Sequence, residues 1–142
     1  MTPQGRGILL VEDDEHDIFF MERAMVKANL DPPIHVATNG QDAIDYLRGV
    51  GKYPDRATYP LPGCIFLDLK LPDGPADDVY EAAKESDPEM PIVVITGYPD
   101  SEMLDRILAK GPVTVLKKPL QVEQLQQTVR ILGHKDAAKL AA

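Results

Sequence analysis

The hydrophobic positions of the chain follow two alternating patterns. Five short apolar runs, rich in β-branched residues, have the length of buried strands. Most of them are continuous rather than alternating, as in strands that are covered on both faces. They are Gly7–Val11, Ile34–Ala37, Cys64–Leu67, Ile92–Ile95 and Val113–Leu116. Between these runs, apolar residues recur at spacings of three and four, which predicts amphipathic helices.

Five helices are predicted from these spacings. Their apolar positions are Ile18, Met21, Met25 and Ala28; Ala43, Ile44 and Leu47; Val79, Ala82 and Ala83; Met103, Leu104, Ile107 and Leu108; and Val122, Leu125, Val129 and Leu132. Five strands alternating with five helices predict βαβ units and an α/β fold. Because crossovers are right-handed, few topologies remain. We expect a flavodoxin-like (βα)5 doubly wound parallel sheet with strand order 2-1-3-4-5.

The length of 142 residues corresponds to one domain. We expect a flexible N-terminus over 1–6, one domain over 7–133, and a short tail over 134–142 that is either a frayed helix end or a cloning remnant. The segment Gly49–Gly63 is a long connection rich in Gly, Pro and Tyr. Loops of this length are often functional or mobile. Pro75 and a scarcity of large apolar residues predict that the third helix is short or loosely packed.

Composition and charge exclude several classes of function. A formal net charge of −8 argues against a nucleic-acid partner, which calls for a basic patch. We find no apolar run long enough to span a membrane, and the N-terminus lacks the apolar core of a signal peptide. The single cysteine, Cys64, lies in an apolar run and fits a reducing, cytoplasmic setting. His16, His35 and His134 lack metal-ligand spacing, so we expect surface roles for them.

Side chains that can bind a ligand or take part in a reaction follow four of the five predicted strands. The first strand is followed by Glu12, Asp13 and Asp14; the third ends at Asp68, the fourth at Thr96 and Gly97, and the fifth is followed by Lys118 and Pro119. The carboxyl ends of parallel strands meet at one edge of the sheet, where ligands bind. We therefore expect these residues to converge, except for Asp14, which we expect to be a helix N-cap.

The types of these residues favour phosphoryl chemistry. Carboxylates that are forced together repel each other, and a divalent ion such as Mg²⁺ relieves that repulsion while also binding a phosphate oxygen. A carboxylate such as Asp68 can act as a nucleophile towards phosphorus. The phosphoryl group in transfer needs positive charge around its oxygens, which Mg²⁺ and Lys118 would supply. Thr96 can donate its hydroxyl to the attached group, and Gly97 leaves its backbone N–H accessible.

Four motifs give the chain a specific family resemblance. The segments Ile8–Asp14 (ILLVEDD), Ile65–Pro72 (IFLDLKLP), Val93–Gly97 (VVITG) and Leu116–Pro119 (LKKP) resemble the receiver domain of two-component response regulators. The similarity covers about Gly7–Gly133, which is nearly the whole chain.

This resemblance implies a role for each residue of the motifs. Asp68 is the expected phospho-acceptor. Asp13 is the expected direct ligand of Mg²⁺ (or Mn²⁺), Glu12 supports it through water, and the residue two after the acceptor, Lys70, contributes its backbone carbonyl.

Three more residues match the family pattern. Thr96 matches the switch hydroxyl that moves towards the phosphoryl group. Lys118 matches the lysine that pairs with that group, and Pro119 matches a proline that is often cis.

The resemblance also implies a signalling role rather than an ordinary enzyme. The domain would accept a phosphoryl group from a phosphohistidine on a sensor histidine kinase or a histidine phosphotransfer protein, and would slowly dephosphorylate itself. With no output domain after it, the output is expected to be contact with a downstream protein, or a homodimer through the fourth helix, fifth strand and fifth helix. The end of the second helix and the long loop are similar to stand-alone regulators that partner phytochrome-type kinases.

One departure keeps a second function open. Many receivers carry Tyr or Phe three residues before the lysine, where this chain has Val115. Valine and the unusual third helix favour a phosphorylation-independent interaction module on the same fold, while the complete set of acids, threonine and lysine disfavours it.

A third reading is an enzyme or a flavin binder on a flavodoxin-like sheet. A flavin phosphate would be repelled by the acids at 12–14, and a phosphatase with an aspartate nucleophile would want a second acid where Lys70 stands.

Overall fold

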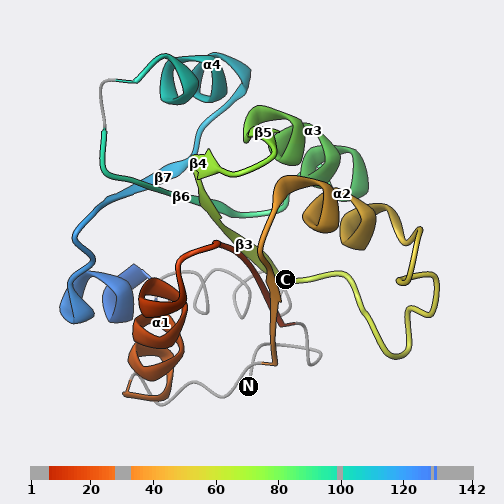
Figure 1. The fold of residues 1–142 in the computed structure, drawn as a ribbon, viewed down its shortest axis with the longest axis horizontal. Helices are drawn as coiled ribbons and strands as arrows, with labels where there is room; N and C mark the ends of the chain where they lie inside the picture. Colours follow the sequence, from red (N-terminus) through yellow and green to blue (C-terminus); the bar gives the residue numbers. More distant parts are fainter. Residues whose placement is uncertain (1–6, 28–32, 99–100, 129, 131–142) are drawn as a thin grey trace, which may run out of the picture.

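The computed structural model describes residues 7–27, 33–98, 101–128 and 130. Its centre is a five-stranded parallel sheet in the order β2-β1-β3-β6-β7 (Figure 1), which confirms the predicted fold class and strand order. The strands are β1 (Ile8–Val11), β2 (Ile34–Ala37), β3 (Cys64–Asp68), β6 (Ile92–Thr96) and β7 (Thr114–Lys117). The predicted strand runs match these bounds to within about one residue at each end.

The helices cover both faces of this sheet. They are α1 (Glu15–Lys27), α2 (Gly40–Arg48), α3 (Asp77–Ser86) and α4 (Glu102–Lys110), and residues 122–128 are also helical. Of the apolar positions that predicted them, Ala28, Val129 and Leu132 lie outside the described residues. In Figure 1, α1 and the helix over 122–128 lie on one side of the sheet, and α2, α3 and α4 lie on the other. The doubly wound arrangement is therefore confirmed.

Successive strand residues enter two separate cores, because side chains alternate between the faces of a sheet. On β1, Leu9 packs in the core under α2, α3 and α4, whereas Leu10 packs in the core under α1. On β3, Leu67 and Phe66 divide in the same way. Both faces are apolar, which explains why the strands read as continuous apolar runs.

The expectation of a short or loosely packed third helix is wrong. α3 has ten residues, and Val79, Tyr80, Ala82 and Ala83 on it are buried. Small alanines allow α3 to lie close to α2, and the Ser86 hydroxyl donates to the Leu47 carbonyl of α2 at 3.0 Å. Pro75 precedes the helix, so its missing N–H costs no helical hydrogen bond.

A small hairpin follows β3 and was not predicted. It consists of β4 (Lys70–Leu71) and β5 (Gly74–Pro75), which pair antiparallel. Gly74 in its turn has a φ of 131°, a conformation that L side chains rarely adopt. The hairpin places Lys70 directly beside the carboxyl end of β3 (Figure 1).

The long segment Gly49–Gly63 is tied to α2 rather than extended into solvent. The Arg56 guanidinium donates to the carbonyls of Tyr46 and Leu47, both at 2.7 Å, and to that of Tyr59 at 3.1 Å. Tyr53, which belongs to the segment, is buried. These contacts satisfy carbonyls at the end of α2 that have no partner within the helix.

The predicted surface role is wrong for His35 and right for His16, which is exposed; His134 lies outside the described residues. His35 on β2 is half-buried, and its ring stacks on Tyr46 with centroids 4.4 Å apart. Tyr53 and Tyr59 meet the ring edge-on. Since β2 is an edge strand, the tyrosines of the long loop cover a histidine that would otherwise face water.

The composition also led to expectations about the cysteine, about membrane-spanning helices and about the two ends of the chain. Cys64 is buried in the core under α1, as expected for a small apolar side chain. No helix in these parts of the chain combines the length and the apolar character that crossing a membrane requires. The expected flexible N-terminus over 1–6 and the tail over 134–142 lie outside the described residues.

Candidate functional site

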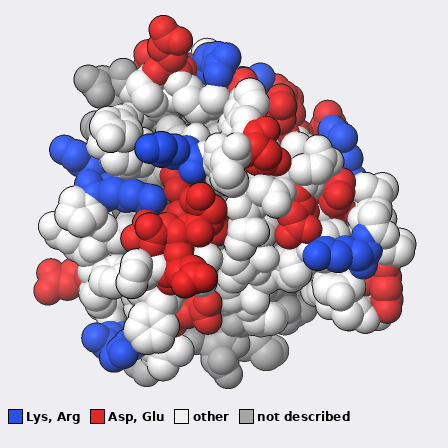
Figure 2. Space-filling model, in the orientation of Figure 1, with Lys and Arg blue, Asp and Glu red and all other residues white. Residues whose placement is uncertain are grey.

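Acidic side chains gather at the carboxyl edge of the sheet. Figure 2 shows them as one patch near the middle of this face, with basic side chains beside it. Glu12 follows β1, Asp68 ends β3 and Thr96 ends β6; they are the polar or charged residues that are buried in the described part of the chain. Burial of polar groups is costly unless they are paired, so their presence at a single edge indicates a functional site.

Three of the predicted residues form a cluster that could hold a metal ion. Glu12, Asp13 and Asp68 each offer a carboxylate oxygen, and these oxygens lie within 4.8 Å of one another. Burial, together with hydrogen bonding to Asp68 and the charge of Asp68, raises the pKa of Glu12 to about 8. Crowded hard oxygen donors of this kind suit Mg²⁺ or Mn²⁺. The residues present therefore fit the expected ion.

Asp14 does not belong to this cluster. Its Oδ1 accepts hydrogen bonds from the N–H groups of His16 at 2.8 Å and Asp17 at 3.1 Å, at the start of α1. These bonds, above all the one from Asp17, lower the pKa of Asp14. The predicted N-cap role is confirmed, and the acidic pair at the site is Glu12 and Asp13.

Lys118 supplies positive charge to the buried acids. Its Nζ lies 3.1 Å from Asp68 Oδ2 and 3.3 Å from Glu12 Oε2. The strand pairing holds it there, because its backbone N–H donates to the Thr96 carbonyl at 2.8 Å. Burial disfavours its charged form, but the nearby carboxylates outweigh that effect and raise the pKa of Lys118. The peptide bond to Pro119 is cis, as expected.

Asp17 is a site residue that the sequence reasoning missed. Its Oδ2 lies 2.9 Å from Lys118 Nζ, which is closer than either predicted partner. The position of Asp17 in the sequence did indicate this role, because the first turn of α1 begins at the same edge of the sheet. However, an acid in a first turn is ordinarily explained by the helix dipole alone.

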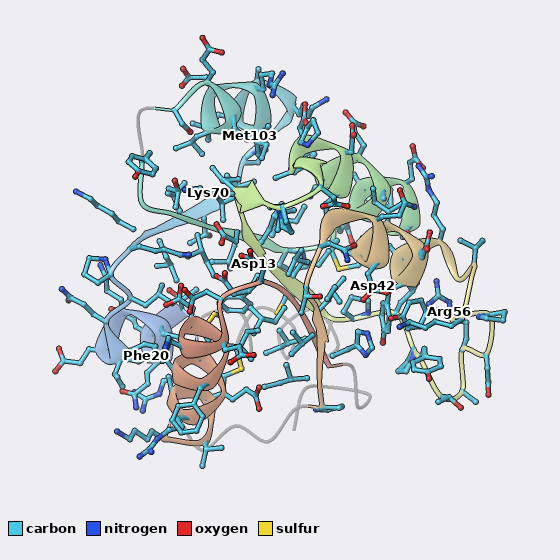
Figure 3. The ribbon with its side chains drawn as sticks, in the orientation of Figure 1. Asp13, Phe20, Asp42, Arg56, Lys70 and Met103 are labelled. Carbon is cyan, nitrogen blue, oxygen red and sulfur yellow. The ribbon has the colours of Figure 1, made fainter. Side chains whose placement is uncertain are left out.

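Lys70 and Asp13 approach the site from different segments. Figure 3 labels both at this edge, Asp13 from the end of β1 and Lys70 from β4. The Lys70 N–H donates to Asp68 Oδ1 at 3.0 Å, while Lys118 holds Oδ2. Both carboxylate oxygens of Asp68 are therefore engaged, and the side chain is fixed in orientation.

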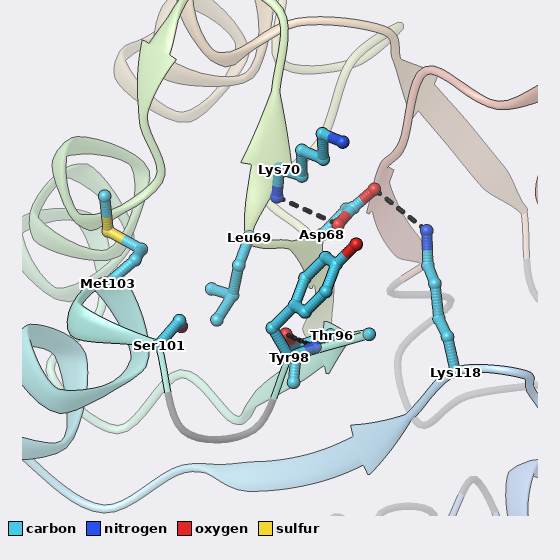
Figure 4. A pocket seen from close by; sticks show the side chains of 9 residues that line it. Asp68, Leu69, Lys70, Thr96, Tyr98, Ser101, Met103 and Lys118 are labelled. Atoms are coloured by element: carbon cyan, nitrogen blue, oxygen red, sulfur yellow. Dashed lines mark hydrogen bonds and ion pairs between the residues drawn. The ribbon is translucent and has the colours of Figure 1, made fainter.

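A cavity of about 550 Å³ lies beside Asp68, between the ends of β3 and β6 and the start of α4 (Figure 4). Thr96 and Gly97 line it, as does Tyr98, a residue that was not predicted. Thr96 Oγ1 accepts a hydrogen bond from the Tyr98 N–H at 2.9 Å. A Cβ atom on Gly97 would come no nearer than 4.0 Å to Lys118 Cβ, so steric crowding does not require glycine there.

Nearly all of the described sequence, including the residues of the acidic site, matches one protein family. Residues 8–130 match the profile described as the response regulator receiver domain. The chain belongs to this family. Its acidic cluster of Glu12, Asp13 and Asp68 is consistent with the phospho-acceptor site of a receiver domain.

A relative of known role agrees with this membership. The regulatory protein LuxO of Vibrio vulnificus is 32% identical over 96 residues, which cover 68% of this chain and 19% of LuxO. The receiver chain thus spans about a fifth of the length of that relative.

Two solved structures resemble the receiver domain along most of its length. The bacteriophytochrome response regulator AtBRR is 32% identical, with a TM-score of 0.76 and coverage of 92% of this chain and 94% of AtBRR. The phosphorylated cyanobacterial phytochrome response regulator RcpA is 25% identical, with a TM-score of 0.74 and coverage of 89% and 90%.

Proposed function

We propose that this receiver domain accepts a phosphoryl group on Asp68 from a phosphohistidine, in a reaction that depends on Mg²⁺ or Mn²⁺, and signals through protein contacts. The observation that carries the proposal is the position of Asp68. It lies 3.1 Å from the Lys118 ammonium and within a cluster of carboxylate oxygens that spans at most 4.8 Å.

The residues that would hold the ion are Asp13, Asp68 and the Lys70 carbonyl, with Glu12 in support. When bound, the ion would offset the negative charge of the acids and of the incoming phosphoryl oxygens. Without that offset, an anionic donor would be repelled by the same carboxylates.

The chain's own residues orient the acceptor. The Lys70 N–H and the Lys118 ammonium each hold one oxygen of Asp68. In the proposed transfer, a carboxylate oxygen of Asp68 forms the new O–P bond as the P–N bond of the phosphohistidine breaks. The bonding pair stays on the imidazole nitrogen, and Lys118 pairs with the transferred group.

Thr96 is proposed to stabilise the transferred group. Its oxygen already accepts the Tyr98 N–H, so its own proton is available for a phosphoryl oxygen. The cavity beside Asp68 and Thr96 gives that group room. Gly97 would support the backbone between Thr96 and Tyr98, and Pro119 would support the backbone of Lys118.

The proposed donor is a sensor histidine kinase or a histidine phosphotransfer protein, in the cytoplasm. The resemblance to AtBRR and RcpA supports a phytochrome-type pathway. The proposed output is a downstream protein or a homodimer that uses α4, β7 and the helix over 122–128.

Replacement of the acceptor tests this function directly. Asp68→Asn should abolish Mg²⁺-dependent labelling by acetyl phosphate, because the amide is not a nucleophile towards phosphorus. Intact-mass spectrometry would measure the phosphorylated fraction. Asp78→Asn, at an exposed position on α3, removes the same charge and should be labelled like the wild type. Labelling of the Asp68→Asn variant would overturn the assignment.

The phosphorylation-independent module remains the second candidate because of Val115. This residue lies on β7 with 38% of its surface exposed, where a valine cannot swing inward as an aromatic ring does. The same labelling experiment separates the two functions, since an interaction module would leave the wild type unlabelled.

A further inference from the structure

Asp73, in the turn between β4 and β5, makes two contacts with a distant helix. Its Oδ1 accepts the Gly40 N–H at 2.7 Å, and its Oδ2 accepts the Gln41 N–H at 2.8 Å. Asn39 already caps α2 by accepting the Asp42 N–H at 2.8 Å. The first three N–H groups of α2 are thus satisfied, two of them by a residue more than 30 positions away in the chain.

The approach of Asp73 to α2 is close. A Cβ atom on Gly40 would lie 3.3 Å from Asp73 Oδ1 and 3.5 Å from Leu71 Cδ1, so glycine suits this position. The two backbone N–H groups, that of Gly40 first, lower the pKa of Asp73. The carboxylate is therefore negatively charged at neutral pH, next to the positive end of the helix dipole.

The hairpin that carries Asp73 is short, and its Leu71 packs partly buried against the core under α2, α3 and α4. Each of its strands has only two residues, pairing Lys70 with Pro75 and Leu71 with Gly74. Two-stranded hairpins are marginally stable alone. One end of this hairpin is fixed by the Lys70 N–H on Asp68, and the other by Asp73 on α2.

The start of α2 is itself joined to the acidic pair. β2 ends at Ala37, whose carbonyl accepts the Glu12 N–H at 3.0 Å, and only Thr38 and Asn39 separate Ala37 from Gly40. A path of hydrogen bonds and short backbone segments therefore runs from Glu12 through α2 and Asp73 to Lys70 and Asp68. The Lys118 ammonium, which contacts both Asp68 and Glu12, closes this path.

We propose that Asp73 is a positioning residue for the metal site. By anchoring the hairpin to α2, it fixes the Lys70 carbonyl relative to Glu12, Asp13 and Asp68. This inference rests on the proposed function, which places a divalent ion among those groups. Contacts behind the ligands of an ion commonly change its affinity by about tenfold or more, and Mg²⁺ demands near-ideal geometry.

The affinity for Mn²⁺, measured by electron paramagnetic resonance of the free ion, tests the anchor. Asp73→Ala should weaken binding by about tenfold. Asp73→Asn keeps one acceptor and should fall between that variant and the wild type. The matched control is Asn39→Ala, which removes a cap from the same end of α2 but leaves both Asp73 contacts in place.

We expect Asn39→Ala to lower the free energy of unfolding, measured in urea, while its Mn²⁺ affinity stays within about twofold of the wild type. Equal losses of affinity in Asn39→Ala and Asp73→Ala would mean that the stability of α2 matters and not the anchor, and would overturn the proposal. Unchanged affinity in Asp73→Ala would overturn it as well. A wild type that binds no Mn²⁺ would instead remove the proposed metal site, and the anchor with it.

Discussion

Lys118 joins the acids of the site through its positive charge. Its ammonium lies within 3.3 Å of carboxylate oxygens of Glu12, Asp17 and Asp68, and Glu12 is fully buried. Removing the cation would leave the carboxylates of Asp17 and Asp68 without their counter-charge, beside a buried Glu12 whose pKa is raised to about 8. Losing one partner of a buried pair is strongly destabilising, although the partial exposure of Lys118 reduces the effect.

We expect Lys118→Met to lower the free energy of unfolding by about 2 kcal/mol without Mg²⁺, because the carboxylates lose their counter-charge. Added Mg²⁺ should restore more stability to this variant than to the wild type, since the ion replaces the missing charge. Thermal unfolding with and without Mg²⁺ measures both effects. Lys117→Met, at the exposed neighbouring position on β7, should change stability by less than about 0.5 kcal/mol. Equal effects of the two substitutions would contradict this role.

The site residues that sequence could predict are those attached to strand ends. Asp68, Thr96 and Lys118 follow directly from the rule that parallel strands deliver their carboxyl ends to one edge. Asp17 and Asp73 could not be found in this way. Their partners lie on other elements, and no periodicity encodes which turn of a helix or hairpin meets which distant N–H or ammonium group.

At the scale of elements, an apolar pattern predicts a strand but not the side chains that cover it. β2 and the loop Gly49–Gly63 are an example. The strand was predicted correctly, but the burial of its His35 depends on an aromatic cluster formed with Tyr46, Tyr53 and Tyr59. Tyr53 donates its hydroxyl proton to Asp42 at 2.7 Å. His35 Nε2, 3.2 Å from the same hydroxyl, must then be the donor in that contact.

This cluster gives stability a pH dependence with a definite sign. Burial among the tyrosines lowers the pKa of His35; Asp42 favours the charged form and Lys52 opposes it. A lowered pKa in the folded state means that the unfolded chain binds the proton more readily. The contribution of neutral His35 to the free energy of unfolding is therefore complete above the unfolded-state pKa of 6.5. It is lost as the pH falls below that value.

We expect the free energy of unfolding of the wild type to fall more between pH 7 and pH 5 than that of His35→Gln, whose amide stays neutral and can still donate to Tyr53. The comparison of the two proteins isolates His35 from other groups that titrate in this range. Urea unfolding at a series of pH values measures it. His16→Gln, at an exposed position, should follow the wild type; identical profiles for all three proteins would refute the assignment.

At the scale of the whole molecule, the site joins the two halves of the sheet. Its residues follow β1, β3, β6 and β7, which are four of the five strands, and an ion held by Glu12, Asp13 and Asp68 would join the ends of β1 and β3, which separate on unfolding. An ion that binds only the folded state stabilises all of it by mass action. At about 100 times the dissociation constant the gain is about 2.7 kcal/mol, which for a domain of this size raises the Tm by about 5 to 10 °C.

We therefore expect saturating Mg²⁺ to raise the Tm of the wild type by that amount and to leave Asp13→Asn nearly unchanged, because an uncharged amide is a poorer ligand in place of the exposed carboxylate of the cluster. Asp78→Asn should respond to Mg²⁺ like the wild type, which controls for the loss of one negative charge. Differential scanning calorimetry measures all three proteins. A full Mg²⁺ response in Asp13→Asn would move the ion away from Glu12, Asp13 and Asp68, and would leave the crowding of these acids to be relieved by Lys118 alone.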